Sequence, residues 1–212
     1  MPSFPLKVPG EPMPFVADGV MHFDGRTRTV TPVQRFAPCT LEAWVWPEEY
    51  RDTGTQAVIG SDIPTKYGIG LGITGVVPFV EIVPGILKGT QPVPLRKWSH
   101  LAGVFSEEGT RLYLDGKLVT KGPATRAEGG TKFVIGNIGL GNPIDYFKGK
   151  VRAVRINQGE RYADAFIPVE QLLPDATTVL LYTAESVRGD VVNDFSGKGH
   201  HGRVERGFAS PP

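Results

Sequence analysis

The chain has 212 residues, of which 40% are hydrophobic and 21% charged, and 23 Lys and Arg residues against 22 Asp and Glu residues leave a net charge of +1. The two signs are interspersed, without the basic stripe that phosphate backbones require, which argues against a nucleic-acid partner. No apolar run approaches the roughly 20 residues that span a bilayer, and the first residues lack the basic and apolar regions of a secretory signal. The 27 glycines and 19 prolines suit many short strands joined by turns and indicate an all-β protein.

The chain contains a single cysteine, Cys39. One cysteine excludes an internal disulfide, and no spacing of Cys and His residues fits a zinc site. Because a free cysteine usually behaves as a small hydrophobe, we predict that Cys39 is buried at the start of a strand.

The first 18 residues are rich in proline. Five prolines between positions 2 and 14 remove backbone donors and fix φ, which is typical of an extended arm or linker. Residues 20–23 are then predicted to form the first strand, closed by a turn at Asp24 and Gly25. Residues 28–31 are predicted to continue that strand.

Residues 41–47 alternate strictly between two faces, which carry Glu42, Trp44 and Trp46 on one side and Leu41, Ala43 and Val45 on the other. Both faces are largely apolar, which indicates a central strand that is covered on at least one side. A tryptophan within a sandwich strand is more often a core residue, so we predict core positions for Trp44, Trp46 and Trp98. The alternative is that these rings stack on sugars.

Residues 56–60, 67–73 and 77–83 are the next predicted strands. In the second of these, glycines at 68, 70 and 72 alternate with apolar residues, so one face carries almost no side chains. We predict a curved or bulged strand there, with close approach of another backbone or a ligand as the alternative.

The stretch 98–121 contains the clearest local pattern. A strand over 100–105 is followed by a hairpin over 111–120, whose tight turn is Asp115-Gly116. Later strands are predicted over 133–136, 146–156 and 179–182 and around Val204, with one helical turn at 169–173. About a dozen strands without a long helix predict two packed antiparallel sheets in one domain, residues 19–208, with a short tail at 209–212.

Seven phrases in a fixed order carry a resemblance to a known family: HFDG (22–25), TLEAWVWP (40–47), KWSHLAGVF (97–105), RLYLDGKLV (111–119), KFVIGN (132–137), YFKGKVRAVRI (146–156) and DFSGKGHHGRV (194–204). The chain resembles laminin-G-like (LamG) domains of the concanavalin A-like lectin/glucanase superfamily. The resemblance implies a jelly-roll sandwich that binds carbohydrates or proteins, often with calcium, at an extracellular, cell or virion surface.

Catalysis is not expected. Superfamily members that cleave β-glucans resemble one another in a strand with two or three acidic residues at alternating positions, which sets an acid and a nucleophile about 5 Å apart. This sequence has no such strand, since Glu42 and Glu81 are isolated acids within apolar runs. The missing carboxylate pair argues against a hydrolase.

Calcium requires six to eight oxygen ligands, usually from loop carboxylates. Asp24 and Asp194 are the candidate metal ligands, with Asp145 as a further candidate. Many relatives carry an Asp-Glu pair where this chain has Arg152-Ala153, and an arginine there repels a cation. The adjacent His200 and His201 point to opposite sides of an extended chain, so we predict that they hydrogen-bond the neighbouring turn instead of binding a metal.

We therefore predict a non-catalytic recognition module that binds carbohydrate or protein through long loops at one edge of the sandwich. The loops 60–67, 84–91 and 137–145 carry polar groups that suit sugar hydroxyls, and the candidate ligand-binding residues are Tyr67, Asn137, Asn142, Asp145 and Tyr146. Tyr67 or Tyr146 is expected to be an exposed aromatic platform. The alternative is a structural or assembly domain of a cell-surface or viral particle, in contact with neighbouring subunits or domains.

Overall fold

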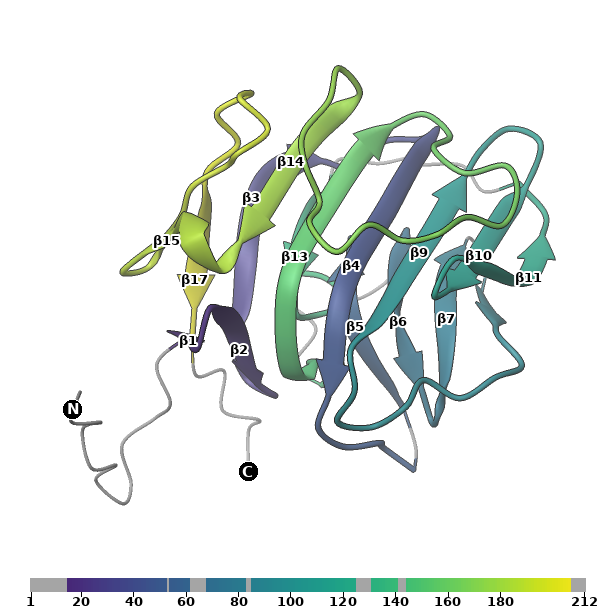
Figure 1. The fold of residues 1–212 in the computed structure, drawn as a ribbon, viewed down its shortest axis with the longest axis horizontal. Helices are drawn as coiled ribbons and strands as arrows, with labels where there is room; N and C mark the ends of the chain where they lie inside the picture. Colours follow the sequence, from purple (N-terminus) through teal and green to yellow (C-terminus); the bar gives the residue numbers. More distant parts are fainter. Residues whose placement is uncertain are drawn as a thin grey trace.

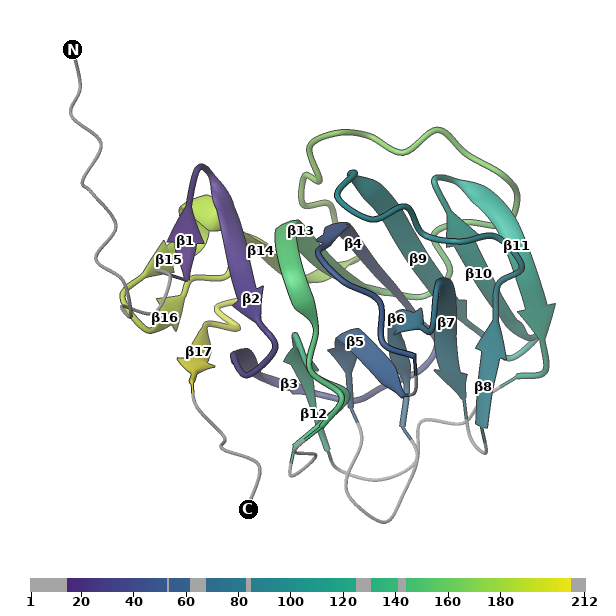
Figure 2. The same cartoon turned by 90° about the horizontal axis from the view of Figure 1, so that it is seen from below.

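The computed structural model describes residues 15–52, 54–61, 68–82, 85–124, 131–140 and 144–206. Within these ranges the strands pair into two antiparallel sheets, of eight and nine strands, which pack face to face (Figures 1 and 2). The same ranges contain one short helix, the 3-10 turn η1 (Ala184–Ser186). The predicted all-β sandwich is confirmed.

The eight-stranded sheet is called sheet A. Its order is β1-β2-β13-β4-β9-β10-β11, and β14 also pairs with β13. Its strands are β1 (Val16–Ala17), β2 (Val20–Asp24), β4 (Cys39–Pro47), β9 (Ser99–Phe105), β10 (Thr110–Leu114), β11 (Lys117–Gly122), β13 (Lys148–Gln158) and β14 (Thr178–Thr183).

The nine-stranded sheet is called sheet B, with the order β15-β16-β17-β3-β12-β5-β6-β7-β8. Its strands are β3 (Arg28–Gln34), β5 (Thr55–Gly60), β6 (Gly70–Thr74), β7 (Val77–Ile82), β8 (Gly85–Lys88), β12 (Lys132–Ile135), β15 (Val187–Arg188), β16 (Val191–Val192) and β17 (Gly202–Glu205).

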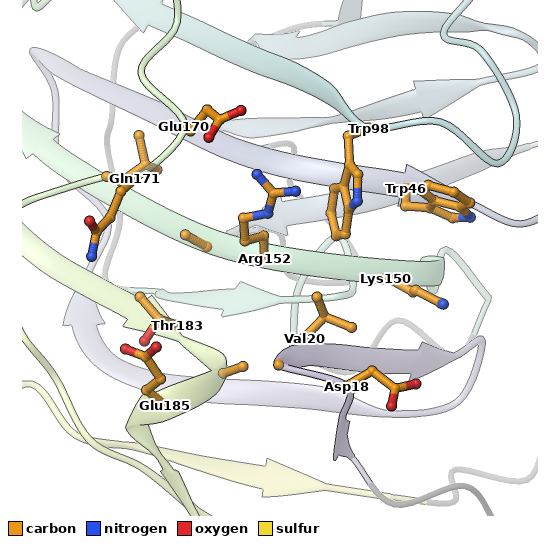
Figure 3. A pocket seen from close by; sticks show the side chains of 14 residues that line it. Asp18, Val20, Trp46, Trp98, Lys150, Arg152, Glu170, Gln171, Thr183 and Glu185 are labelled. Atoms are coloured by element: carbon orange, nitrogen blue, oxygen red, sulfur yellow. The ribbon is translucent and has the colours of Figure 1, made fainter.

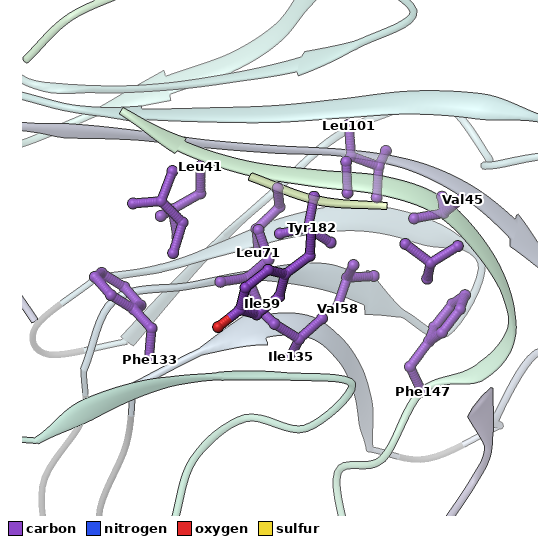
Figure 4. Packing of buried hydrophobic residues seen from close by; sticks show 14 of the residues in the cluster. Leu41, Val45, Val58, Ile59, Leu71, Leu101, Phe133, Ile135, Phe147 and Tyr182 are labelled. Carbon is purple, nitrogen blue, oxygen red and sulfur yellow. The ribbon is translucent and has the colours of Figure 1, made fainter. Parts of the chain in front are cut away.

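The hydrophobic core lies between the two sheets (Figure 4). The alternation of β4 is as predicted, because Leu41, Ala43 and Val45 are fully buried in the core while Trp44 and Trp46 lie on the other face. Burial of one such aliphatic side chain stabilises the fold by about 1.5 to 3 kcal/mol. Cys39 is also fully buried, as predicted, and burial raises the pKa of its thiol.

The pairing of the strands near the two ends of the described chain differs in part from what the sequence predicted. The segment 28–31 does not continue the first strand, since β3 belongs to sheet B and β2 to sheet A. The C-terminal strand expected around Val204 is part of the sandwich as β17, which pairs with β3. Residues 15–17, which we assigned to the arm, contribute Phe15 to the core and β1 to sheet A. Residues 1–14 of the predicted arm and the tail at 209–212 lie outside the described residues.

Two local predictions are wrong and one is confirmed. Residues 169–173 do not form the expected helical turn. The Val169 carbonyl instead accepts a hydrogen bond from Trp44 Nε1 at 2.8 Å. The loop expected at 84–91 contains β8. The hairpin β10–β11 forms as predicted, with Asp115 and Gly116 at φ 49° and 75° in its turn.

The glycine-rich face of β6 is covered by another part of the chain. A Cβ on Gly72 would lie 2.3 Å from the Gln56 carbonyl oxygen, and a Cβ on Gly60 of the neighbouring β5 would lie 2.0 Å from the Ile138 carbonyl oxygen. Ile138 packs there against Ala57 and a phenylalanine of β7. The backbone after β12 therefore approaches β5 at Gly60, while the bare face of β6 leaves room for the Ile138 side chain, whose Cδ1 would lie 3.0 Å from a Cβ on Gly70. The bulge next to this face lies on β5, between Ala57 and Ile59, where its pairing with β6 shifts register.

Candidate functional site

The outer face of sheet A is partly covered by the long connection between β13 and β14. This connection, residues 159–177, is called the covering segment, and it crosses the outer side of β13, β4 and β9 (Figure 1). Its Tyr162 and Phe166 rings stack with centroids 3.6 Å apart and pack against Tyr113 of β10. The covering segment thereby closes one part of the face and forms the wall of a groove beside it.

Glu42 of β4 fastens the covering segment to the sheet. Its fully buried carboxylate accepts hydrogen bonds from Arg155 Nε at 2.8 Å, Asn157 Nδ2 at 3.0 Å and the Tyr162 hydroxyl at 2.8 Å, and it lies 3.1 Å from His100 Nε2. Burial alone raises the pKa of Glu42, but the contacts with His100 and Arg155 outweigh it and lower the pKa to about 2. The carboxylate is thus a fixed anion surrounded by protein donors, which suits a structural role and not a general acid.

A β-bulge in β13 places Arg152 at the groove. Val151 pairs with Val45 of β4 and Ala153 pairs with Trp44, so Arg152 is the extra residue. On the other side of β13, the pairing with β2 extends to Val151 and the pairing with β14 begins at Ala153. Arg152 therefore stands where two strands share one side of β13 and leave a gap, and bulges of this kind commonly re-aim a side chain next to a binding site.

The groove occupies this gap (Figure 3). Its volume is about 460 Å³, within the range of small-ligand sites. Figure 3 shows Arg152 at its centre, with Trp98 beside it and Glu170 and Glu185 across from it. The lining residues come from six separate parts of the sequence: Asp18, Gly19, Val20, Trp46, Trp98, Lys150, Arg152, Ala153, Glu170, Gln171, Leu172, Thr183, Ala184 and Glu185.

The tryptophans do not occupy the core, so that prediction is wrong. Trp44, Trp46 and Trp98 are all partly exposed on the outer side of sheet A. Trp46 and Trp98 meet edge to face with ring centroids 5.7 Å apart and line the groove, whereas Trp44 packs beneath the covering segment against Leu172. Their position follows from the β4 alternation, because core residues already fill its opposite face.

Cations accompany the aromatic rings in the groove. The Arg152 guanidinium lies 4.6 Å from the Trp98 ring and 5.7 Å from the Trp44 ring, and Lys150 Nζ lies 5.6 Å from the Trp46 ring. Each contact of this type contributes about 0.5 to 1 kcal/mol when exposed. A second hollow of about 390 Å³ shares Trp46 and Lys150 with the groove. The two hollows therefore adjoin at Trp46 and Lys150.

The loop residues predicted to bind a ligand are occupied within the fold or lie outside the described ranges. Asn137 is fully buried, and its Oδ1 accepts from the Gly139 amide at 3.1 Å. Asp145 Oδ1 accepts from the Thr55 hydroxyl at 2.7 Å. Tyr146 is 1% exposed, so it is not an exposed platform, and that expectation is wrong. Tyr67 and Asn142 are outside the described residues.

The predicted metal ligands are also engaged by the protein. Asp24 accepts the Arg26 amide at 2.9 Å, and Asp194 accepts four hydrogen bonds from protein donors. The described ranges contain no cluster of three or more His, Cys, Asp or Glu side chains that could hold a metal ion. The paired histidines behave as predicted, since His200 Nδ1 lies 2.8 Å from the Val179 carbonyl oxygen and His201 Nδ1 accepts the Asp194 amide at 3.0 Å.

This sandwich with a groove on one sheet face defines a lectin-like fold. Residues 24–164 match Laminin_G_3 of the Concanavalin A-like lectin/glucanases superfamily. Because the match covers more than half of the chain, the protein belongs to this family, and the predicted LamG identity is confirmed. No curated protein matches the sequence significantly. In the part of the chain that the structure describes, no helix is long and apolar enough to cross a membrane.

Solved structures share the fold at low sequence identity. A Bacteroides ovatus protein whose name assigns it to carbohydrate binding superposes with a TM-score of 0.63 at 17% identity, covering 89% of this chain and 61% of its own. Domain 4 of the Geobacillus stearothermophilus arabinanase AbnA, in complex with arabinotriose, gives 0.53 at 20%, with coverages of 69% and 75%. The CBM40 domain of the Ruminococcus gnavus IT-sialidase, bound to α2,3-sialyllactose, gives 0.52 at 12%, with 72% and 93%. This chain thus spans 61% of the Bacteroides protein.

The groove was missed by reasoning from the sequence, although one signal pointed to it. The outward alternation of Trp44 and Trp46 was recognised, but the rings were assigned to the core. Arg152 was noted only as a departure from the family pattern. The bulge that brings Arg152 beside Trp98 depends on the register between β13 and its neighbours, and a single sequence does not specify that register.

Proposed function

We propose that the protein is a non-catalytic carbohydrate-binding module whose site is the groove on the outer face of sheet A, not the loops at the sandwich edge. The observation that carries this proposal is the pair of partly exposed rings, Trp46 and Trp98, at the rim of a groove with polar side chains on its other walls. Apolar faces of sugar rings pair with aromatic planes, and their hydroxyls need donors and acceptors nearby.

The similar folds support this proposal. Two of the solved structures above hold an arabinotriose and a sialyllactose, and the Bacteroides protein is named for carbohydrate binding. These likenesses concern the fold, while the groove residues of this chain supply the chemical argument. The edge loops are weaker candidates, because Asn137 and Asp145 already bind other parts of the protein.

The non-catalytic part of the proposal rests on the carboxylates. Glu42, the acid of the central strand, is buried and surrounded by four partners. The three acids of the groove, Asp18, Glu170 and Glu185, come from three separate segments and not from alternating positions of one strand. Incubation with laminarin and other β-glucans should yield no reducing ends above a heat-inactivated control, and new reducing ends would overturn this part.

The binding site is tested by a glycan array followed by calorimetry on the glycans that bind. Trp98→Ala and Trp46→Ala should each weaken binding by about tenfold, since each removes a stacking surface of about 1 kcal/mol or more. Phe195→Ala is the matched control, because Phe195 is an aromatic ring 43% exposed that does not line the groove. Unchanged affinity in both tryptophan variants, with a loss in Asp145→Asn, would return the site to the edge loops.

A structural or assembly domain is the second candidate, and exposed apolar side chains favour it. Ile167 of the covering segment is 92% exposed, and Val169 and Leu173 are also exposed. Contiguous exposed apolar surface often marks a protein contact. Light scattering distinguishes the two functions: a carbohydrate-binding module should remain monomeric, whereas an assembly domain should form multimers that Ile167→Ser weakens.

A further inference from the structure

We infer that the groove selects sugars that carry a carboxylate, and that Arg152 binds this carboxylate. The inference rests on the proposed function and deepens it by naming the ligand class. It depends on three observations about the described residues: the free guanidinium of Arg152, the contrast with other arginines of the same face, and the division of charge between the walls of the groove.

The guanidinium of Arg152 lies near two aromatic rings and has no hydrogen-bond partner among the described residues. Trp98 and Trp44 lie against it at 4.6 and 5.7 Å. Within the described ranges it donates no hydrogen bond and no carboxylate lies within ion-pair distance, although Glu170 and Glu185 line the same groove. The cation–π contacts restrict the guanidinium without using its N–H donors, and the fork of those donors matches a carboxylate in a bidentate geometry.

Other arginines on this side of the molecule are paired. Arg155, three residues further along β13, binds Glu42 at 2.8 Å, and Arg111 and Arg161 each contact a carboxylate of the covering segment. The fold therefore satisfies its structural arginines internally. Arg152 differs from them because it is displaced by the bulge and directed at the groove.

The groove separates its charges into two walls. Arg152 and Lys150 stand on β13 next to the tryptophans, and Lys150 also forms no ion pair with any described residue. Two of the three acidic side chains, Glu170 and Glu185, lie across from Arg152, while the third, Asp18, lies near Lys150 (Figure 3). A sugar ring against Trp98 would direct a carboxylate to the cationic wall and its hydroxyls to acceptors on the other. A uniformly anionic polymer such as a polysulfate fits this division less well, because the acidic wall repels it.

The experiment compares chains that differ only in the carboxylate. Oligogalacturonate and its methyl ester form one pair, and α2,3-sialyllactose and its methyl ester form the other, so the two pairs separate uronic from sialic acids. Dextran sulfate is the probe for general anion binding. Affinities are measured by calorimetry for the wild type, Arg152→Gln, Arg152→Lys and Trp98→Ala. Arg203→Gln, an exposed arginine on β17 of sheet B, is the matched control.

We expect the acid of at least one pair to bind about tenfold tighter than its neutral counterpart, because hydrogen bonds to charged groups are stronger than neutral ones. Arg152→Gln should remove this preference, Arg152→Lys should retain part of it, and Arg203→Gln should not change it. Equal binding of acid and neutral chains by the wild type, with both lost in Trp98→Ala, would overturn the inference and leave the proposed function standing.

Two further outcomes are decisive. Binding of dextran sulfate as tight as that of the carboxylated chains would overturn selection for a carboxylate. Absence of glycan binding, or binding that Trp98→Ala does not change, would overturn both the proposed function and the inference. Circular dichroism of each variant establishes that it is folded, and the comparison of acid with neutral chains on the wild type does not depend on any variant.

Discussion

Glu42 and Arg155, side chains with 0% and 2% exposure, form an ion pair of 2.8 Å between adjacent strands of sheet A, beneath the covering segment. Removing one partner of a buried pair leaves the other charge uncompensated. Glu42→Gln should therefore lower the free energy of unfolding by about 3 kcal/mol or more, measured by urea denaturation at pH 7. Glu160→Gln breaks the more exposed pair with Arg111 and should cost about 1 kcal/mol or less. Equal effects of the two substitutions would contradict this role of Glu42.

The same carboxylate makes stability depend on acidity. Its pKa is lowered from 4.5 to about 2 in the folded protein, burial being outweighed by His100 and Arg155. A depressed folded pKa gives a contribution that is complete above the unfolded value and is lost as the pH falls from about 4.5 toward about 2. The stability difference between wild type and Glu42→Gln, about 3 kcal/mol at pH 7, should shrink across that window. A difference that stays constant from pH 7 to pH 2 would sink this linkage.

Gly60 tests the close contact between β5 and the backbone at Ile138, which follows β12. A Cβ at this position would lie 2.0 Å from the Ile138 carbonyl oxygen, and Gly60 is held within β5 of sheet B, so the backbone at Ile138 would have to shift. Gly60→Ala should destabilise the protein by about 3 kcal/mol or more, the upper range for overpacking. Gly75→Ala is the control, because Gly75 has open space but a φ of +54°, and it should cost about 1 to 2 kcal/mol. A Gly60→Ala protein that melts with the wild type would show that Ile138 is placed elsewhere.

Asp194 organises the turn before β17. Its carboxylate accepts the Leu181, Ser196 and His200 amides at 3.0, 2.9 and 3.0 Å and the Ser196 hydroxyl at 2.6 Å. Burial raises the pKa of Asp194, but these hydrogen bonds outweigh it and hold the pKa below its usual value. Asp194→Asn should cost about 1 to 3 kcal/mol, because an amide cannot accept all four.

Calcium distinguishes this role from that of a metal ligand. We expect the melting temperature of the wild type to be the same with millimolar calcium and with a chelator. Asp190→Asn, at an exposed pair with Arg206, is the control for loss of a surface charge. A calcium-dependent rise in melting temperature that Asp194→Asn abolishes would establish the aspartate as a ligand instead.

Much of the sandwich can be predicted from local patterns. The alternation of 41–47 specified which residues of β4 face the core, and Asp115-Gly116 specified the hairpin turn. The errors concern strands whose partners lie far away in the sequence. Segments 20–23 and 28–31 are short, similar in pattern and adjacent, and only the pairing with β13 or with β12 and β17 assigns them to different sheets.

The candidate site was less accessible to sequence reasoning for the same reason. Polar residues after glycine are typical of binding loops, yet Asn137 and Asp145 are used to hold the backbone after β12 against sheet B. Whether an outward tryptophan such as Trp46 is covered or open depends on the path of the 159–177 segment. Buried hydrogen bonds to Glu42 hold this segment in its path. They join residues that are far apart in the sequence, so a local sequence pattern does not predict them.

The composition of the groove has a consequence for the smallest unit that can bind. The family match spans 24–164 and includes the tryptophans and Arg152, but the residues opposite them, at 18–20, 170–172 and 183–185, fall on either side of it. A protein trimmed to the family boundaries would present Trp98 and Arg152 on an open surface without acceptors facing them. Relatives whose sequences are similar only within residues 24–164 can therefore share the tryptophans of the site and differ in the residues opposite them, which would determine sugar specificity under the proposed function.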